Sequence, residues 1–211
     1  MDQKAQAEYF EKKSGLMVDL GFRSDGLQSL KTYLDFLWAS NEDLNLISRK
    51  MTYEELIDNH VIDCLLPLKY FPKNIKRAAD FGSGGGLPGV VYALQFPEIS
   101  WTLFEKSHLK QDFLNECVKI SKNIKVLGEI PLELKDIHCV TSRAFKAVDV
   151  LLDMSRTYYK SGGKYFLLKG RKEKIDEELL LAKKKFKDLR VEITELKSPV
   201  LDVERHLVSI G

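Results

Sequence analysis

The feature that most restricts the fold is a change of pattern after Lys76. From there, short apolar runs of strand length alternate with helical stretches. Strands are expected at 77–81, 100–105, 124–128, 137–142 and 163–169, and helices at 87–95, 107–121 and 147–159. Because strands joined through a crossover helix lie parallel, this order predicts an α/β fold: a doubly wound, Rossmann-like sheet with helices on both faces.

The segment before this alternation has a different periodicity. Apolar residues recur at intervals of three and four over 26–38, and a second helix is expected at 53–66, with Thr52 as its N-cap. Neither stretch has the pattern of a strand. We therefore expect an N-terminal helical extension over 1–70 and a Rossmann-like domain over 71–211.

The other flank of the alternating region ends differently. A charged helix is expected at 172–187, followed by two β-rich runs at 189–197 and 203–210. The interval between these runs is too short for a crossover helix, so they should pair as an antiparallel hairpin at one edge of a mostly parallel sheet.

Composition excludes several classes of protein. With 211 residues, 44% of them hydrophobic and 30% charged, the chain can build its own core. Its charged start is not a signal peptide, and no apolar run approaches the roughly 20 residues that span a bilayer. The three cysteines and four histidines are scattered without metal-ligand spacing. We expect a cytoplasmic protein with reduced cysteines, no membrane contact and no metal.

The run AADFGSGGGLPGV at 78–90 follows the first expected strand, where ligands bind in such sheets. Glycine permits sharp turns and close approach of a ligand to the backbone. Gly84, Gly86 and Gly89 fit G-x-G-x-x-G, and Glu105 lies at the distance of the acid that binds a dinucleotide ribose. This pattern indicates a nicotinamide cofactor.

A second interpretation depends on which glycine comes first. In a dinucleotide site the first glycine directly ends the strand; here that is Gly82, and Leu87 then occupies the place of the third glycine. Counted from Gly82, the run is G-x-G-x-G preceded by Asp80, a pattern of S-adenosylmethionine-dependent methyltransferases. Glu105 would then accept the ribose hydroxyls. We favour S-adenosyl-L-methionine, bound by residues that include Asp80, Gly82, Gly84 and Glu105, and keep a nicotinamide-dependent oxidoreductase as an alternative.

Further features concern the methyl acceptor. The fourth strand ends in VTSRAF at 140–145, without the (N/D)-P-P-(Y/F) tetrapeptide of amino-nitrogen methyltransferases or the cysteine of C5-pyrimidine enzymes. Residues 156–190 hold twelve Lys and Arg against five Asp and Glu, which favours an RNA substrate. KGRKEK at 169–174 should face phosphates, whereas KKKFK at 183–187 is expected to be a solvated helix face.

Six segments taken together resemble one family. They are NLISR (45–49), HVIDCLL (60–66), DFGSGGGLPG (80–89), SRAF (142–145), LLKG (167–170) and LDVERHLVSI (201–210). In this order they are similar to the motifs of bacterial 16S rRNA (guanine-N7) methyltransferases, also called glucose-inhibited division protein B. The resemblance extends from about residue 25 onward. It implies a class I methyltransferase fold with a helical extension, acting on N7 of a guanine in the decoding-region stem-loop of 16S rRNA.

The resemblance also implies roles for individual positions. Gly82 and Leu87 match cofactor-contacting residues, and Pro131 and Leu132 fall where the family contacts the adenine. Arg143 matches an arginine that borders both cofactor and target. The chain departs from the family at Glu105, where aspartate is frequent, and at Gln111, where arginine is common, which puts a cation at 111 in doubt.

N7 methylation needs little chemistry from side chains. Guanine N7 has a lone pair and no proton, so orientation can supply most of the acceleration without a catalytic base. We expect Arg143 and Lys169 to orient the target, with a structural salt bridge as the alternative for Arg143. A set of further polar residues is expected to form buried structural hydrogen bonds, with direct substrate contact as the alternative: Asn45, His60, Asp63 and His206. The expected partner of a monomeric enzyme is 16S rRNA, an assembly intermediate or the small ribosomal subunit; another RNA or a small molecule is the alternative acceptor.

Overall fold

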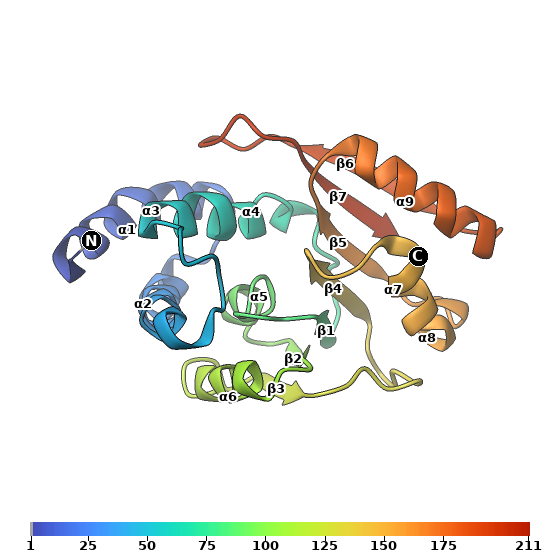
Figure 1. Cartoon of the computed structure of the whole chain (residues 1–211), viewed down its shortest axis with the longest axis horizontal. Helices are drawn as coiled ribbons and strands as arrows, with labels where there is room; N and C mark the ends of the chain where they lie inside the picture. Colours follow the sequence, from blue (N-terminus) through green and yellow to red (C-terminus); the bar gives the residue numbers. More distant parts are fainter. Residues whose placement is uncertain (1) are drawn as a thin grey trace.

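The computed structural model describes residues 2–211, which form a seven-stranded sheet between two layers of helices (Figure 1). The strands lie in the order β3-β2-β1-β4-β5-β7-β6. Their bounds are β1 Arg77–Phe81, β2 Ser100–Phe104, β3 Ile124–Leu127, β4 Cys139–Arg143, β5 Tyr165–Lys169, β6 Val191–Leu196 and β7 Arg205–Ile210. Each expected strand is present, with ends that differ by at most two residues.

Strand pairing confirms the doubly wound topology. β1 pairs in parallel with β2 on one side and with β4 on the other, so the direction of winding reverses at β1. β7 is antiparallel to both of its neighbours, β5 and β6. The expected hairpin therefore lies at the sheet edge, with its second strand toward the centre.

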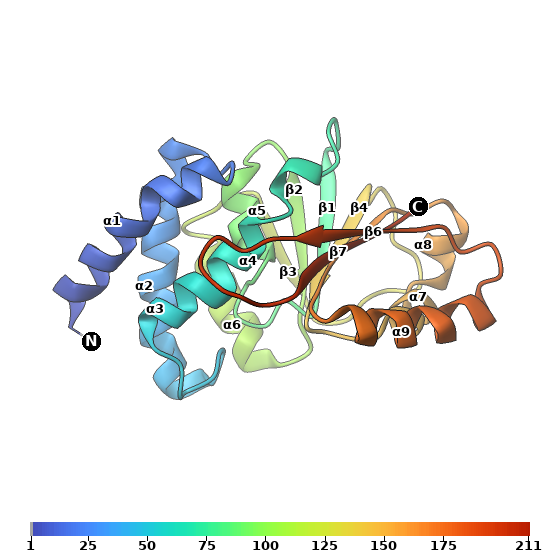
Figure 2. The same cartoon turned by 90° about the horizontal axis from the view of Figure 1, so that it is seen from above.

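The helices form two layers (Figure 2). Their bounds are α1 Gln3–Asp19, α2 Leu27–Leu44, α3 Tyr53–Leu56, α4 Ile62–Leu65, α5 Gly89–Gln95, α6 His108–Cys117, α7 Val148–Met154, α8 Arg156–Lys160 and α9 Lys172–Lys185, with short turns η1 Ser24–Gly26 and η3 Leu68–Tyr70. α5 and α6 lie with the N-terminal helices on one side of the sheet, and α7, α8 and α9 lie on the other. No helix within residues 2–211 is long and apolar enough to cross a membrane.

Alternating strand residues divide the core into two hydrophobic clusters. Ala78, Trp101 and Phe166 belong to the cluster beneath the N-terminal helices, α5 and α6. Their neighbours Ala79 and Tyr165 belong to the cluster beneath α7 and α9. This alternation also decides the direction of polar side chains at the strand ends, because successive residues of a strand point to opposite faces.

The helical extension shares the first of these clusters with the sheet. Helix α2 is longer than expected, and the expected second helix contains a π-helical turn, η2 Ile57–Val61, between α3 and α4. Thr52 and Glu55 form a capping box at its start. This cluster contains residues from both sides of residue 70. We therefore propose that the helical extension and the Rossmann-like domain fold as one unit rather than independently.

Two further elements differ from expectation. The single helix expected at 147–159 is two helices, because Ser155 leaves helical geometry (φ −118°) and its hydroxyl donates to the carbonyl of Leu151. The helix expected to reach 121 ends at Cys117, where the chain turns through Ser121 into β3.

Candidate functional site

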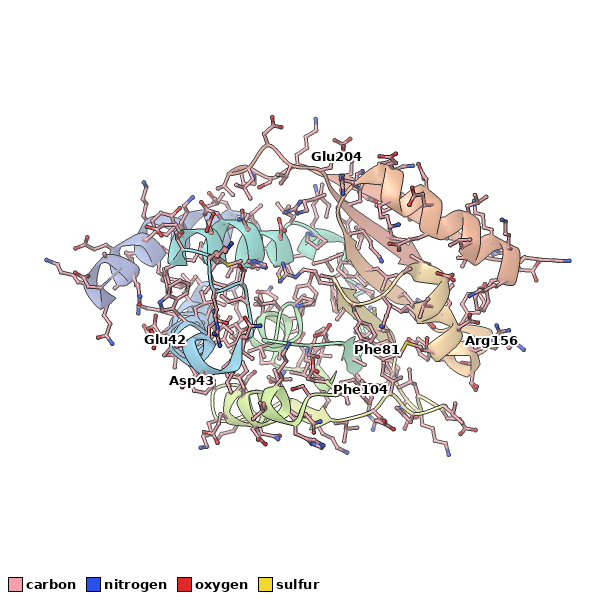
Figure 3. All side chains as sticks on the ribbon, in the orientation of Figure 1. Glu42, Asp43, Phe81, Phe104, Arg156 and Glu204 are labelled. Carbon is pink, nitrogen blue, oxygen red and sulfur yellow. The ribbon has the colours of Figure 1, made fainter. Side chains whose placement is uncertain are left out.

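The glycine loop begins where β1 and β2 end side by side. Phe81 and Phe104, the last residues of the two strands, pack edge to face with ring centroids 5.6 Å apart (Figure 3). The backbone N–H groups of Gly82 and Ser83 both donate to the Phe104 carbonyl, at 2.9 and 3.1 Å. These bonds fold the loop over the end of β2.

Two of the loop glycines are required by geometry. Gly82 has φ +70°, and a Cβ there would lie 2.1 Å from Cδ2 of Phe145. Gly84 has φ +55° and no side chain within 4 Å of where its Cβ would be. Gly82 therefore accommodates a neighbouring ring, while Gly84 leaves open space beside the loop.

Glu105, directly after β2, holds this loop in place. Its Oε2 accepts from the Gly84 N–H at 2.9 Å, and its Oε1 accepts from the Ser107 N–H at 2.9 Å. A carboxylate has about four lone-pair sites. Glu105 therefore retains acceptors for hydroxyl groups of a ligand.

A cavity of about 720 Å³, the glycine-loop cavity, opens in front of these residues. Its walls include five predicted site residues: Gly82, Gly84, Leu87, Glu105 and Arg143. Leu46 and Ile47 from the helical extension, Phe104, Gly128, Ile130, Val150 and Met154 add largely apolar surface. An enclosed site with apolar walls and a few directed polar groups is typical of a small-molecule site.

Asp80 lies outside this cavity. It is fully buried on the α5 side of β1, and a Cβ at Gly89 would lie 2.6 Å from its Oδ2. Neither carboxylate oxygen has a hydrogen-bond partner among residues 2–211. Burial raises the pKa of Asp80 to about 7, opposed by the nearby Ser83 hydroxyl, the Gly89 N–H and the charge of Arg143. Gly89 is thus required for close packing of helix against strand rather than for a ligand.

Pro131 and Leu132 also lie outside the glycine-loop cavity, and Leu132 is 85% exposed. Gly128 and Ile130, from the same loop, form the wall instead. Lys110 lines the cavity, whereas the Gln111 amide bonds to the Lys106 carbonyl. The adenine-contact role of Pro131 and Leu132 stays a prediction.

A second cavity of about 740 Å³, the adjacent cavity, lies beside the first. Residues that line both are His60, Arg143, Ala144, Phe145 and Lys146. The adjacent cavity is completed by side chains of η2, α4, β5, α9 and β7, among them Asp63, Lys169, Glu178, Arg205 and His206. Two ligands bound in these cavities would therefore meet at the end of β4.

The backbone at the end of β4 is strained. Ala144 adopts the left-handed region with φ +53°, which is uncommon for a residue with a side chain. Arg143 just before it has a buried Nε with no hydrogen-bond partner among residues 2–211, and Phe145 just after it packs on Gly82. Strain of this kind concentrates at functional sites because the surrounding structure must enforce it.

The side chain of Lys169 is bonded to other residues of the protein. Its Nζ forms a 2.8 Å ion pair with Glu178 of α9 and donates to the Lys146 carbonyl at 2.9 Å. Both side chains of the pair are largely buried. Lys169 therefore fixes α9 and the loop after β4 at the adjacent cavity, and direct contact with a substrate stays a prediction.

Two of the polar residues expected to be structural, Asp63 and His206, do have such contacts. Asp63 accepts from Arg205 Nε at 2.6 Å, which joins α4 to β7, and His206 Nδ1 lies 2.6 Å from the Gly170 carbonyl. Asn45 is exposed and ends α2 in the left-handed conformation, where among the described residues only its backbone N–H bonds, to the Asn41 carbonyl, so its expected buried hydrogen bond is absent. Glu204, next to Arg205, accepts from the Lys172 N–H. His60 has no such partner.

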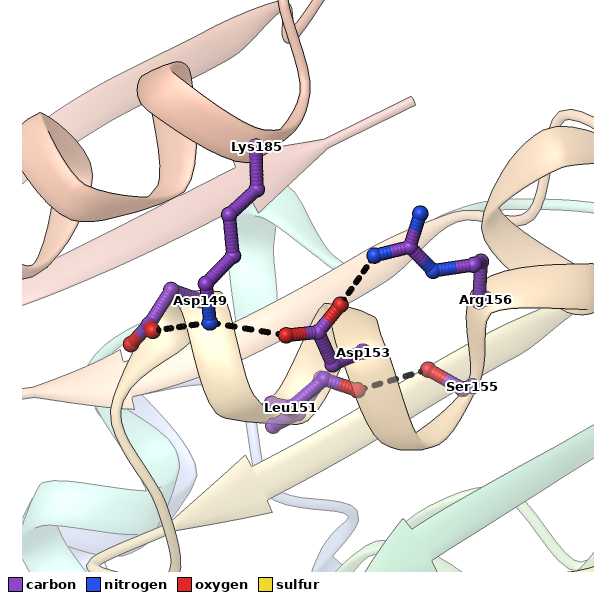
Figure 4. Close-up of polar contacts among 6 residues, drawn as sticks. All are labelled: Asp149, Leu151, Asp153, Ser155, Arg156 and Lys185. Atoms are coloured by element: carbon purple, nitrogen blue, oxygen red, sulfur yellow. Dashed lines mark hydrogen bonds and ion pairs between the residues drawn. The ribbon is translucent and has the colours of Figure 1, made fainter.

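Several cations of the basic C-terminal third are held in local ion pairs. Lys185 joins α9 to α7 through Asp149 at 2.8 Å and Asp153 at 2.7 Å, and Arg156 pairs with Asp153 (Figure 4). Lys172 and Lys174 pair within α9. The cations in these pairs are therefore less available to a nucleic acid.

Sequence reasoning missed several wall residues. Phe145, Lys110 and Ile130 carry no motif of their own, although Phe145 adjoins Arg143 within SRAF. The one available signal was the position of each directly after a strand or at the start of the helix that follows. Contacts such as that of Phe145 with Gly82 depend on tertiary packing.

This geometry agrees with comparisons to known proteins. The family model described as rRNA small subunit methyltransferase G matches residues 26–208. The chain belongs to this family. A relative from Bdellovibrio bacteriovorus named Ribosomal RNA small subunit methyltransferase G 1 is 69% identical over 204 residues, which are 97% of this chain and 100% of the relative.

Solved structures confirm the class I methyltransferase fold of this methyltransferase G family member. The precorrin-6y C5,15-methyltransferase from Geobacter metallireducens has a TM-score of 0.54 and 13% identity, covering 78% of this chain and 91% of that one. M. capricolum TrmK, in complex with S-adenosyl-homocysteine, has a TM-score of 0.50 and 15% identity, covering 67% and 64% respectively. The family and fold predictions are confirmed.

Proposed function

We propose that the chain is an enzyme that transfers a methyl group from S-adenosyl-L-methionine to N7 of a guanine in 16S rRNA of the small ribosomal subunit. The observation that carries this function is the pair of cavities joined at Arg143, one built on the glycine loop and Glu105 and the other on η2, β5 and β7. One cavity suits a small cofactor, and the other suits an extruded base. Membership of the methyltransferase G family supports the same activity.

The glycine-loop cavity has the groups that this cofactor requires. Gly84 leaves room for a ligand against the backbone, and the carboxylate of Glu105 offers acceptors to ribose hydroxyls. Ile130 and Met154 supply apolar contacts for an adenine ring. When bound, the cofactor supplies an electrophilic methyl group on a sulfonium. The assignments of Gly82, Leu87 and Arg143 to the cofactor are part of this proposal.

The protein's contribution to the transfer is orientation. Arg143 and Phe145 separate the cavities, so their positions determine the approach of a base to the methyl group. Exposed Lys146 lies beside this opening and can contact a backbone phosphate. We further propose that the enzyme acts as a monomer in the cytoplasm, on naked rRNA, an assembly intermediate or the mature small subunit.

Expression in a bacterium that lacks its own enzyme of this family tests the proposal. Mapping of 7-methylguanine in the 16S rRNA should show one restored site with the wild-type chain and none with Arg143→Ala. Calorimetry on the purified proteins should show binding of S-adenosylhomocysteine and not of NADH. Unmodified rRNA with a stably folded wild-type chain would refute the acceptor; selective NADH binding would favour an oxidoreductase.

A further inference from the structure

His60 occupies an unusual place in the molecule. It lies in the π-helical turn η2 and lines both the glycine-loop cavity and the adjacent cavity. Its Nδ1 is buried without a hydrogen-bond partner, and its Nε2 makes no hydrogen bond within residues 2–211. A partly buried imidazole that no part of the described fold uses is available to a ligand. π-Helical turns are frequent at functional sites.

The surroundings of His60 determine its charge. Arg143 of β4 and Arg205 of β7 face it, and the carboxylate of Asp63 on α4 is already paired with Arg205. The other charged groups of the two cavities are Glu105, Lys106, Lys110, Lys146, the Lys169–Glu178 pair and Lys174. Burial, together with the positive charges of Arg143 and Arg205, lowers the pKa of His60 to about 3. The imidazole is therefore neutral at physiological pH.

A neutral imidazole has one donor and one acceptor nitrogen. The enclosed Nδ1 has nothing to donate to, and an orphaned buried N–H is rarer in proteins than an under-satisfied acceptor. The proton therefore belongs on Nε2, the nitrogen that is not enclosed. At the junction of the cavities, His60 offers an uncharged N–H donor.

We propose that His60 positions the target guanine by donating its Nε2–H to O6 of the base. This inference rests on the proposed function. The base must present N7 toward the glycine-loop cavity, and O6 is the acceptor beside N7 on the same edge of guanine. His60 is one of the residues at that opening. The contact fixes the edge of the base while leaving the N7 lone pair free.

The charge balance of the reaction favours a neutral donor at O6. The N7 lone pair forms the new N–CH₃ bond as the S–CH₃ bond breaks, the bonding pair stays on sulfur, and no proton moves. Positive charge thus passes from the sulfonium to the purine. A guanidinium at O6 would oppose this charge, whereas a neutral imidazole does not. Arg143 is then left for the carboxylate of the cofactor or a phosphate.

Two substitutions separate this role from a structural one. His60→Phe keeps an aromatic ring and removes the donor, and His60→Gln returns an N–H donor to about the place of Nε2. We expect kcat to fall about tenfold or more for His60→Phe and to recover within a few-fold for His60→Gln. Affinity for S-adenosylhomocysteine and thermal stability should not change in either variant. His138→Phe is the control, because His138 accepts from the Lys76 N–H and lines neither cavity.

The base provides an independent test. An RNA substrate with 2-aminopurine at the target position retains N7 and lacks O6. Wild-type enzyme should methylate 2-aminopurine as slowly as His60→Phe methylates guanine. The rate of His60→Phe should be the same on 2-aminopurine as on guanine. The wild-type rate should show no ionisation near pH 6.5.

The outcomes distinguish a failure of the proposed function from a failure of the role of His60. If wild-type enzyme methylates no guanine, the proposed function fails. If wild-type enzyme is active and His60→Phe stays within twofold of it, or His60→Gln is as impaired as His60→Phe, the role of His60 is refuted. Additive losses on the 2-aminopurine substrate, or loss of cofactor affinity in parallel with rate, would also overturn it.

Discussion

Asp80 allows the packing of the sheet beneath the glycine loop to be tested through pH. Its carboxyl group is 1% exposed, has no hydrogen-bond partner among the described residues, and lies against Gly89 at the start of α5. Burial raises its pKa from 3.8 to about 7. Between those two values the folded protein holds a proton that the unfolded chain has released.

The sign of the effect follows from this difference in bound protons. Where the folded state binds more protons than the unfolded state, the free energy of unfolding falls as pH rises. The favourable contribution of a neutral Asp80 to the free energy of unfolding is therefore fully present below pH 4. It decreases as the pH rises from there to about 7. One pKa unit corresponds to about 1.4 kcal/mol, so the loss is about 4 kcal/mol.

Urea unfolding of wild type and Asp80→Asn from pH 4 to pH 8 measures this loss. Asparagine is nearly isosteric and does not ionise, so wild-type stability should decline relative to the variant by about 4 kcal/mol across this range. Asp112→Asn, at an exposed position on α6, is the control for the substitution itself. Parallel stability curves for wild type and Asp80→Asn would refute a buried, protonated carboxyl beneath the loop.

Two further substitutions test the walls of the cavities. Gly82→Ala should abolish binding of S-adenosylhomocysteine in calorimetry, because its Cβ would displace the Phe145 ring; Gly162→Ala, with φ +82° and open space, should lose only about 1 kcal/mol of stability and keep binding. Equal binding by the two variants would contradict this explanation. Lys169→Met should destabilise the fold by about 3 kcal/mol in urea unfolding, because it leaves the buried carboxylate of Glu178 without an ion-pair partner and with only the Val148 N–H as a donor among the described residues. Adding Glu178→Gln should recover part of that loss, and no recovery would show that the ion pair is not the cause.

The sequence predicted the sheet well because its signals are local. The run of strands, the glycine loop and Glu105 each follow from periodicity or from spacing along the chain. The placement of the C-terminal hairpin at the sheet edge was also predicted, because a short connection allows only antiparallel pairing. The order of β6 and β7 within the sheet was not, since it depends on which strand packs better against β5.

Side-chain direction at the site was less predictable. Asp80 adjoins the glycine loop in sequence, yet its side chain faces α5, because successive strand residues point to opposite faces of the sheet. The sequence motif does not indicate which of the two faces Asp80 takes. Leu132 is exposed although its neighbour Ile130 lines the cavity, because residues 128–138 form no helix or strand that would fix their direction. His60 was grouped with structural residues, and only the three-dimensional arrangement shows that it lacks a partner.

The position of β7 between β5 and β6 has a consequence for the timing of folding during synthesis. The ribosome makes β6 before β7, yet β6 has no neighbour in the sheet except β7. A nascent chain that has exposed β6 must hold it unpaired until residues 205–210 emerge and pair with β5. Because Arg205 of that strand also contacts Asp63, the wall of the adjacent cavity closes only then. We therefore expect the adjacent cavity to stay incomplete for as long as this strand remains in the exit tunnel of the ribosome that is making the chain.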